Sequence, residues 1–395
     1  MDIIVEKLNY IWPFLAVITP VVFFHELGHY LVARANRVSV EVFSIGFGPE
    51  LFGINDRHGT RWKFSLLPLG GYVKFVGDAN AASTTPAETV EEMSPEESAK
   101  CFHNKSVGQR SAVAVAGPVA NFILAIAIFA VLFATVGQQF TPAIVGAVLE
   151  DSAADEAGLV AGDEFIRING QEITRFEDIQ ATVQMNLGDT LDIVVLRDGS
   201  EVALQAAPRM VAAQDTFGNQ TERPQLGISV PGVAFTKHDP GTAIWQAVKQ
   251  TVYVITASGK AVGQMIAGSR STSDLGGPIR IAVMSSQVAA GGIAGLAFFL
   301  AVISISLGLI NLVPIPVLDG GHLLFNFFEA LMGRPLKPQI QNIGQTVGLV
   351  LIIALMVWVT GKDILGLASL RLAMRKYVRP TCLDLDISLA AQQGL

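Results

Sequence analysis

Long apolar runs are the first feature of the sequence. Four mostly apolar stretches lie at about residues 9–33, 111–136, 291–313 and 344–360. A helix needs roughly 20 mostly apolar residues to cross a bilayer, so the pattern predicts about four transmembrane helices, the last of them extended by its flanks. The chain before the first run is not basic, and no small-residue cleavage site follows that run. We therefore expect a retained span rather than a signal peptide.

The stretch between the first two runs changes to strand period. Trp62, Phe64 and Leu66 alternate with polar residues, and glycines divide residues 38–77 into short pieces. This pattern predicts short β-hairpins. Their many apolar side chains would be unfavourable in water, so we expect a membrane-associated β region. Residues 78–105 are polar and are expected to form a loop.

The stretch between the second and third runs predicts a small α+β domain at 140–210. Asp198-Gly199 separates two alternating segments, which is typical of a hairpin, and "FEDIQATVQMN" has helical spacing. Residues 211–240 are expected to be a linker or a small extension. Residues 241–270 have apolar positions at helical spacing with interspersed cations, which favours an amphipathic helix at the membrane interface. A soluble amphipathic helix is the alternative.

Composition supports a membrane protein and excludes some partners. Hydrophobic residues make up 51% of the chain and charged residues only 15%, with a mean hydropathy of +0.47. The net charge is −7 and there is no basic tract, so no nucleic-acid partner is expected. Two distant cysteines, Cys101 and Cys382, form neither a disulfide framework nor a zinc cluster and are expected to be unpaired.

The first run carries candidate chemistry in "HELGH". His25 and His29 are four residues apart, so on a helix they share a face and can hold one metal ion. Imidazole suits zinc, and Glu26 is placed to take a proton from metal-bound water. A buried charge must be paired or bind metal, so a purely structural role for ionisable groups inside an apolar run is disfavoured.

A catalytic zinc needs a third protein ligand. In the metzincin pattern, a glycine and a histidine ligand follow H-E-x-x-H at fixed offsets. This sequence does not match it, because those positions hold Val32 and Ala35. Glu41 and Glu50 lie in the strand-like region. Asp319 in "VLDGGH" is a better candidate, since it follows prolines that interrupt an apolar run. Spacing alone leaves two interpretations of Asp319 open, a zinc ligand and a turn residue.

Three motifs in order resemble one known family. "HELGH", "GPVAN" and "NLVPIPVLDGGH" resemble the signatures of the site-2 protease family of intramembrane zinc metalloproteases, and "AGLVAGDEFIRINGQ" is similar to part of a PDZ domain. The layout is that of the bacterial RseP group of sigma-E regulators, with one PDZ signature rather than two. The resemblance covers about residues 10–360. It implies a polytopic α-helical membrane protein with a membrane-associated β-hairpin region and an inserted PDZ-like α+β domain.

The resemblance also implies roles for individual residues. Zn²⁺ would be held by His25, His29 and Asp319, with Glu26 as the general base. Asn311 would hold the substrate backbone. Asn121, also assigned to the substrate-binding site, would pack and hydrogen-bond close to the zinc site, although contact between spans alone also explains an asparagine there. The domains expected are an N-terminal membrane part at 1–136, a PDZ-like domain at 140–210, a linker with an amphipathic helix at 211–290, a C-terminal membrane part at 291–361 and a tail at 362–395.

The expected activity is hydrolysis of peptide bonds in or near the transmembrane segments of single-span proteins, which are the partners along with the lipid bilayer. The resemblance implies anti-sigma-factor-like proteins or signal-peptide remnants as substrates. A substrate helix must unwind before attack, and an edge strand within 41–77 could accept the unwound segment; proline near Phe64 tests this hypothesis. An inactive PDZ scaffold and a metal transporter are the alternatives. Glu26 argues against the first and the lack of visible internal repeats against the second.

Flanking charges predict the orientation. Cations concentrate between the first two spans, which favours a cytoplasmic loop there in a bacterial inner membrane and places the acidic PDZ-like domain in the periplasm. The segment between residues 137 and 240 contains sixteen acidic and six basic residues. The tail after residue 361 is also basic, although this orientation would place it outside the cytoplasm, so the tail does not fit the rule. The cations of the first loop are Arg34, Arg37, Arg57, Arg61, Lys63, Lys74 and Arg110.

Overall fold

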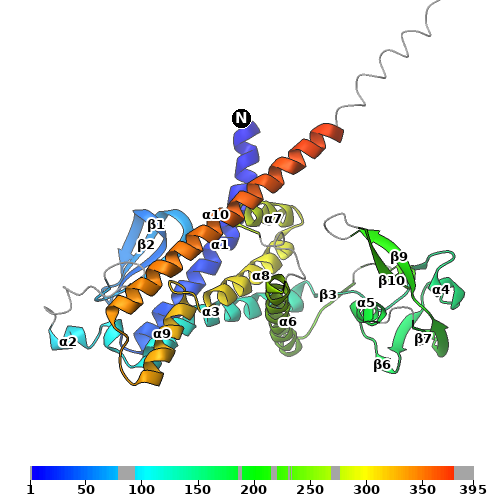
Figure 1. Ribbon diagram of the computed structural model, residues 1–395, viewed down its shortest axis with the longest axis horizontal. Coiled ribbons are helices and arrows are strands. Elements are labelled where there is room, and N and C mark those ends of the chain that lie inside the picture. The colour runs from blue at the N-terminus through cyan, green and yellow to red at the C-terminus, as the bar shows by residue number, and fades with distance from the viewer. Residues whose placement is uncertain are drawn as a thin grey trace, which may run out of the picture. The chain divides into compact units, whose positions relative to one another are not determined.

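The computed structural model describes residues 2–78, 94–185, 189–214, 220–229, 232, 234–267 and 276–377 (Figure 1). Most of the expected loop at 78–105, the end of the tail and Cys382 lie outside these residues. The chain divides into two compact units. Unit 1 comprises 1–132 and 244–395, and unit 2 comprises 133–243.

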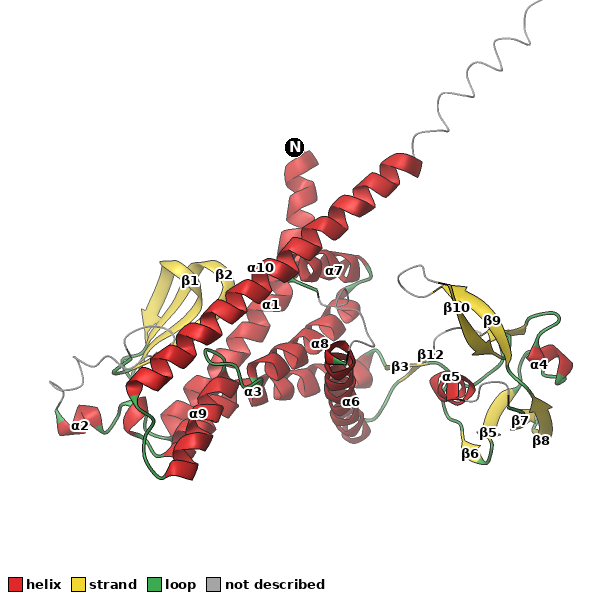
Figure 2. Cartoon of the chain, viewed as in Figure 1, coloured by secondary structure: helices red, strands yellow, loops and turns green. Residues whose placement is uncertain are grey.

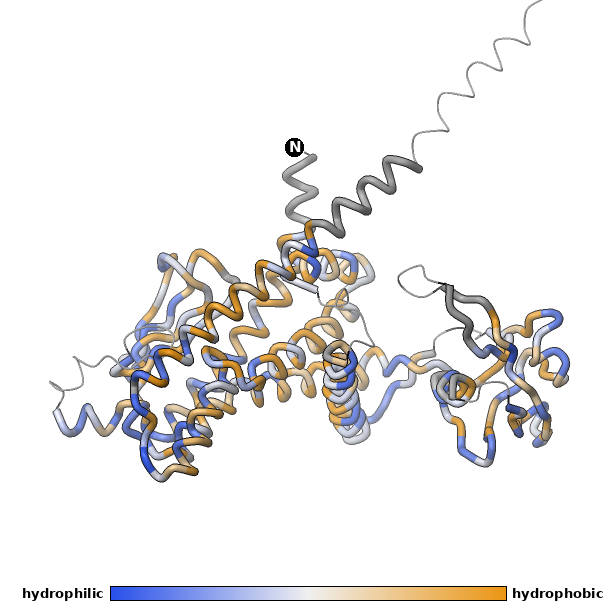
Figure 3. The backbone as a smooth tube through the Cα atoms, viewed as in Figure 1, coloured by the Kyte–Doolittle hydropathy of each residue, from blue (hydrophilic) through white to orange (hydrophobic). Residues whose placement is uncertain are grey.

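Unit 1 is dominated by helices, drawn red in Figure 2. Within the described chain, four segments are long and apolar enough to cross a membrane, in agreement with the four predicted runs: Tyr10–Ala35, Val107–Thr135, Ile293–Asn311 and Gln339–Ile364. Figure 3 shows hydrophobic residues prevailing along them. The helices of this unit are α1 (Asp2–Ala35), α2 (Pro95–Ser98), α3 (Val107–Thr135), α7 (Pro278–Ala290), α8 (Ile293–Asn311), α9 (Asp319–Met332) and α10 (Pro338–Tyr377), with a 3₁₀ turn at Phe102–Asn104; α6 (Pro240–Ile266) begins at the boundary between the units.

Glycines let the helices around the metal-binding motif approach one another. A Cβ on Gly28 of α1 would lie 2.3 Å from the Ala116 carbonyl oxygen of α3, so only glycine fits there. Elsewhere on α3, the Asn121 carbonyl accepts a hydrogen bond from Ser304 of α8 at 2.9 Å. Small residues and interhelical hydrogen bonds are the usual means of joining helices inside a membrane.

The β region is one folded-over sheet rather than several short hairpins. Strand β1 (Val40–Asn55) pairs with β2 (Arg61–Phe75), and each is broken by register shifts. The Cα partners place four segments side by side in the order 50–55, 61–65, 42–45 and 71–75. Long strands that bend back at bulges and glycines look like separate short strands in sequence, which is why the pattern suggested several hairpins.

One face of this sheet packs against α1. Phe43 and Val73 are buried there, with Tyr30 and Ala33 of the helix in the same cluster. The segment 50–55 instead exposes large apolar side chains, including Phe52 and Ile54. The apolar composition that the sequence showed in this region is therefore divided between a helix-facing core and an uncovered outer surface.

The chain between α8 and α9 is irregular, as the two prolines predict. Helix α8 ends at Asn311 and α9 starts at Asp319. A Cβ on Gly320 would lie 2.3 Å from the Val313 carbonyl oxygen, and one on Gly321 2.4 Å from the Ile315 carbonyl oxygen. The two glycines after Asp319 therefore allow the start of α9 to lie directly on the preceding loop.

Unit 2 has an antiparallel four-stranded sheet in the order β6-β5-β7-β8 over an apolar core that includes Phe165, Ile179 and Ile193. Asp198 and Gly199 both have positive φ, as the predicted hairpin turn requires. Its elements are β3 (Gln138–Phe140), β4 (Ala147–Val148), α4 (Ala153–Glu156), β5 (Glu164–Ile168), β6 (Gln171–Glu172), α5 (Phe176–Met185), β7 (Leu191–Arg197), β8 (Ser200–Ala206), β9 (Arg209–Gln214), β10 (Gln220–Gln225), β11 (Ile228–Ser229) and β12 (Ala234–Thr236).

The stretch 211–240 is not a linker in the structure. Its described residues form strands, of which β11 pairs with β4 and β12 pairs with β3, so the end of unit 2 closes on its beginning. Scattered proline and glycine suggested a linker because such short strands have too few residues to show a period. The predicted amphipathic helix is present as α6. Helix α7 was missed, since its start falls in a stretch rich in glycine and serine.

Candidate metal centre

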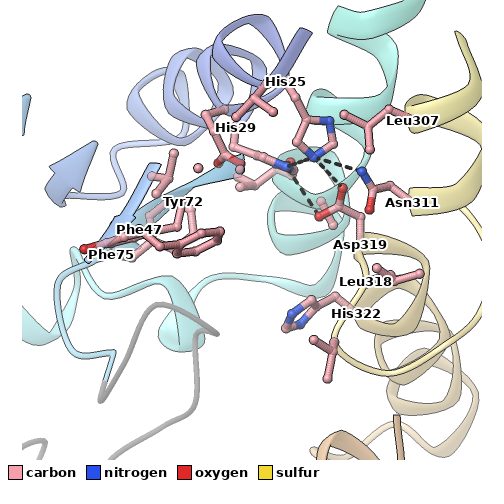
Figure 4. Close-up of a pocket in the computed structure, with 18 of the residues that line it drawn as sticks. His25, His29, Phe47, Tyr72, Phe75, Leu307, Asn311, Leu318, Asp319 and His322 are labelled. Carbon is pink, nitrogen blue, oxygen red and sulfur yellow. Dashed lines mark hydrogen bonds and ion pairs between the residues drawn. The ribbon is translucent and has the colours of Figure 1, made fainter. Parts of the chain in front are cut away.

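Three side chains from distant parts of unit 1 converge on one point. His25 Nε2 lies 3.3 Å from Asp319 Oδ2, and His29 Nε2 lies 3.4 Å from Asp319 Oδ1. The two Nε2 atoms are 3.3 Å apart (Figure 4). Within the described chain these three residues are the group of ligand-type side chains with donor atoms close enough to share a metal ion. Spacing alone left Asp319 either a ligand or a turn residue, and the fold brings it to the histidines.

The local sequence explains why these atoms meet. His25 and His29 are one helical turn apart on α1, so both rings point to the same side. Asp319 is the first residue of α9, directly after the irregular loop, and it is thus held at a helix start rather than in mid-helix. Both histidines are at most 9% exposed. The alternative carboxylates are engaged elsewhere, Glu41 with Lys74 and Glu50 with Arg61.

Backbone and amide groups behind the ligands orient the imidazoles. His29 Nδ1 lies 2.8 Å from the Val113 carbonyl oxygen, which can only accept a hydrogen bond, so the proton is on Nδ1 and Nε2 is free to bind a metal. The Asn121 amide lies 3.2 Å from His25 Nδ1. The buried Asn121 Oδ1 has no other hydrogen-bond partner among the described residues, and with the amide turned so that this oxygen accepts from Nδ1–H, His25 Nε2 is free in the same way.

Gly117 is a member of the site that the sequence reasoning missed. A Cβ at this position of α3 would lie 2.3 Å from His29 Nε2 and 2.8 Å from His25 Cε1. Any side chain would therefore occupy the space of the two rings. The signal was available in "GPVAN", one of the three motifs that resemble the family signatures.

A cavity of about 580 Å³ opens beside the three donors. Glu26 and Asn311 line it, and the Asn311 amide nitrogen lies 3.3 Å from His25 Nε2. Tyr72 of the sheet and His322 of α9 also line it (Figure 4). Five of the six predicted site residues therefore border one cavity. Asn121, the sixth, is fully buried beside the His25 ring and is not among the residues that line the cavity.

The donor set fits zinc. Metal–donor distances of about 2.0–2.2 Å place neighbouring donors of a tetrahedral site roughly 3.3–3.5 Å apart, and the three distances measured here are 3.3, 3.3 and 3.4 Å. Two imidazoles and one carboxylate leave a fourth position facing the cavity, which is the arrangement of catalytic rather than structural zinc. The donors, the open position and the adjacent Glu26 are those of a zinc-dependent hydrolase.

Comparison with known proteins agrees with this class. The model of peptidase family M50 matches residues 13–355, and the chain belongs to that family. A protein of Mesorhizobium japonicum named as a zinc metalloprotease is 42% identical over 359 residues, covering 90% of this chain and 98% of that relative. Metalloprotease MmpA of Caulobacter vibrioides is 37% identical over 373 residues, covering 89% of this chain and 94% of that relative. The protein is thus a zinc metalloprotease of the site-2 protease type, with helices long and apolar enough to cross a membrane.

Among solved structures, the PDZ domain of the SdrC-like protein of Listeria monocytogenes is similar to a part of the chain. The identity is 24%, and the match covers 23% of this chain and 88% of that domain, with a TM-score of 0.18.

Proposed function

We propose that the protein cleaves membrane-spanning segments of single-span proteins, with His25, His29 and Asp319 as zinc ligands and Glu26 as general base. The observation that carries the proposal is the convergence of these three donors beside a cavity that Glu26 borders, inside helices apolar enough to span a bilayer. Water must reach this position, and the cavity supplies the space for it.

The residues divide the chemistry among them. His25, His29 and Asp319 would hold the zinc ion, which would supply Lewis-acid activation of the scissile carbonyl and of water. Glu26 accepts the proton of the attacking water and passes it to the leaving amine. Asn311 donates from its amide to the substrate backbone, which places the carbonyl near the donors. Asn121 acts through His25, whose ring it holds in the orientation that directs Nε2 to the metal.

The outer segment 71–75 of the sheet is the proposed docking edge for an unwound substrate. It has a β partner on one side only among the described residues, and Gly70, Gly71 and Tyr72 line the cavity next to the donors. An extended peptide can add to such an edge through main-chain hydrogen bonds. Phe64 is unsuitable for a test by proline, because it is paired with both Ile45 and Phe52 inside the sheet.

Membrane orientation and substrates belong to the same proposal. The cations between the first two spans support a cytoplasmic position for the sheet, with unit 2 on the periplasmic face of a bacterial inner membrane. The single-span substrates would be anti-sigma-factor-like proteins or signal-peptide remnants, by resemblance to the family. Unit 2 would serve as a PDZ-like domain. A groove between α5 and β11, lined by Ile179, Val183 and Gly227, supports peptide binding rather than a size filter alone.

Cleavage of a model single-span substrate by purified protein in detergent tests the proposal. Wild type and Glu26→Gln are compared, with bound zinc counted in both. We expect one zinc ion per chain in each, cleavage by wild type, and a rate reduced by roughly 10²–10⁴-fold in the variant, because only the proton acceptor is lost. Wild type that holds zinc and cuts no trimmed or untrimmed single-span substrate would contradict the proposal.

A further inference from the structure

The turn between β1 and β2 holds a carboxylate with an unusual number of donors. Asp56 Oδ1 accepts hydrogen bonds from the backbone N–H groups of His58 at 2.8 Å and Thr60 at 2.9 Å. Its other oxygen, Oδ2, accepts from the Tyr30 hydroxyl at 2.7 Å and from Trp62 Nε1 at 3.2 Å. One oxygen therefore closes the turn, and the other reaches outside it.

Tyr30 connects this turn to the metal-binding helix. It follows His29 directly in α1 and is 8% exposed. Its ring meets Trp62 edge-on at 5.0 Å between centroids and Phe43 at 5.9 Å. The hydroxyl and the ring together make a polar and aromatic joint between α1 and the sheet, which we call the Tyr30–Asp56 joint.

A second contact between the same two elements lies at the catalytic residue. A Cβ on Gly71 would be 2.9 Å from Glu26 Cγ, 2.8 Å from Val22 Cγ1 and 2.8 Å from the Ser44 carbonyl oxygen. The segment 71–75 therefore touches the helix beside Glu26 without a side chain between them. Because this segment lines the cavity, the position of the sheet against α1 sets where the segment lies relative to Glu26.

A simple turn does not account for all of these contacts. Closing the turn requires only the two backbone N–H groups. Burial raises the pKa of Asp56, but the hydrogen bonds from Tyr30, Thr60, His58 and Trp62 outweigh it and hold the pKa well below its ordinary value, so the carboxylate is charged at neutral pH. A charged acceptor strengthens the bond from the Tyr30 hydroxyl, which is the part of the network that leaves the sheet.

We propose that Tyr30 and Asp56 are positioning residues that fix the sheet, and with it the register of a docked substrate strand, relative to Glu26 and the metal. The inference rests on the proposed function. Side chains alternate along a strand, so a slip of two residues presents the same face. A loosened joint should therefore spread cleavage over neighbouring peptide bonds rather than simply abolish it.

Product mapping by mass spectrometry tests the effect on register. Tyr30→Phe removes only the hydroxyl, Asp56→Ala removes the acceptor, and Asp56→Asn restores one acceptor oxygen. We expect full zinc content, kcat/KM lowered by roughly 10-fold in the first two variants, additional cleavage sites, and partial recovery in Asp56→Asn. Ser65→Ala is the control, because among the described residues the Ser65 hydroxyl bonds within the sheet, to Ser44 at 3.2 Å.

A distance measurement tests the joint without reference to activity. Spin labels on Ile11→Cys of α1 and Ile54→Cys of the sheet, both at exposed positions, are introduced after replacement of Cys101 and Cys382. Pulsed EPR should give a narrow distance distribution in the wild-type background and a broader one with Tyr30→Phe.

The outcomes distinguish a failure of the positioning role of Tyr30 and Asp56 from a failure of the proposed function. An unchanged distance distribution together with unchanged cleavage sites in Tyr30→Phe would overturn the inference, whatever the rate. If Tyr30→Phe broadens the distance distribution but wild type cleaves no substrate, the proposed function is wrong, whereas the Tyr30–Asp56 joint still fixes the sheet against α1. A broadened distribution with wild-type products would also overturn the inference, because the joint would not control the register.

Discussion

The two units treat buried polar groups in different ways. In unit 2, the buried Asp163 side chain forms an ion pair with Arg197, whose guanidinium donates to both carboxylate oxygens at 2.8 and 2.7 Å. In unit 1, the partly buried Asp319 lies against two imidazoles whose Nε2 atoms point to the same place. The first arrangement is complete in itself, whereas the second is arranged to receive a cation. Burial of a carboxylate thus indicates a function only when its partners are themselves ligands.

The largest expected effect comes from breaking the second arrangement. Asp319→Ala should reduce bound zinc to well below one ion per chain and cleavage by about 10⁴-fold or more, because a ligand and the metal-dependent steps are lost together. Metal analysis and a cleavage assay measure both. Asp163→Ala is the matched control and should leave zinc content intact. Retention of a full zinc ion by Asp319→Ala would show that the third ligand lies elsewhere.

A smaller effect is expected at Gly117, which contacts the ligands without binding metal. Gly117→Ala should weaken zinc binding by roughly 10- to 100-fold, since the added methyl displaces both imidazoles. Competition with a chelator measures the affinity. Gly108→Ala, on the same helix with open space around its Cα, is the control and should bind zinc as wild type does. Equal affinities in the two variants would contradict the cramped geometry at Gly117.

Unit 2 should respond in stability instead of metal binding. Asp163→Ala leaves the Val160 N–H without its acceptor and removes the two hydrogen bonds that Arg197 donates to the carboxylate, while the bond from Arg197 to the Gly158 carbonyl stays. We expect a loss of about 2 kcal/mol in the free energy of unfolding of this unit, since hydrogen bonds to charged groups are involved. Hydrogen exchange of the β5, β7 and β8 amides in the intact protein measures it. Protection equal to wild type would mean that the pair contributes nothing.

The smallest effect is the acid dependence of unit 2. Burial raises the pKa of Asp163, and the hydrogen bonds from Arg197 and Val160 outweigh it, so the folded-state pKa is lowered. The contribution of Asp163 to stability is therefore complete above its unfolded pKa of about 3.9 and is lost as pH falls from there through the folded pKa. Hydrogen exchange over this acidic range should show a slope in wild type that is reduced in Asp163→Asn. Identical slopes would exclude Asp163 as its source.

Sequence reasoning succeeded where the signal is local. The pair His25 and His29 shares a helix face by spacing alone, and the hairpin turn at Asp198-Gly199 follows from residue types that tolerate positive φ. It was less successful where strand pairing depends on the whole chain. The sheet at 40–75 was expected as short hairpins, because long strands that bend at bulges and glycines look like separate short strands. For 211–240 a linker or a small extension was expected, and only the structure shows that its strands pair with β3 and β4.

The sequence by itself determined the four apolar runs, the metal-binding pair with Glu26, and the candidate residues Asp319, Asn311 and Asn121. Only the tertiary structure decided that Asp319 meets the two histidines, that Gly117 makes room for their rings, and that the outer strand beside Glu26 is 71–75. The physical reason is the range of the forces involved. Helix periodicity and turn preferences act over a few residues, whereas a metal site and a sheet edge depend on which distant segments come into contact.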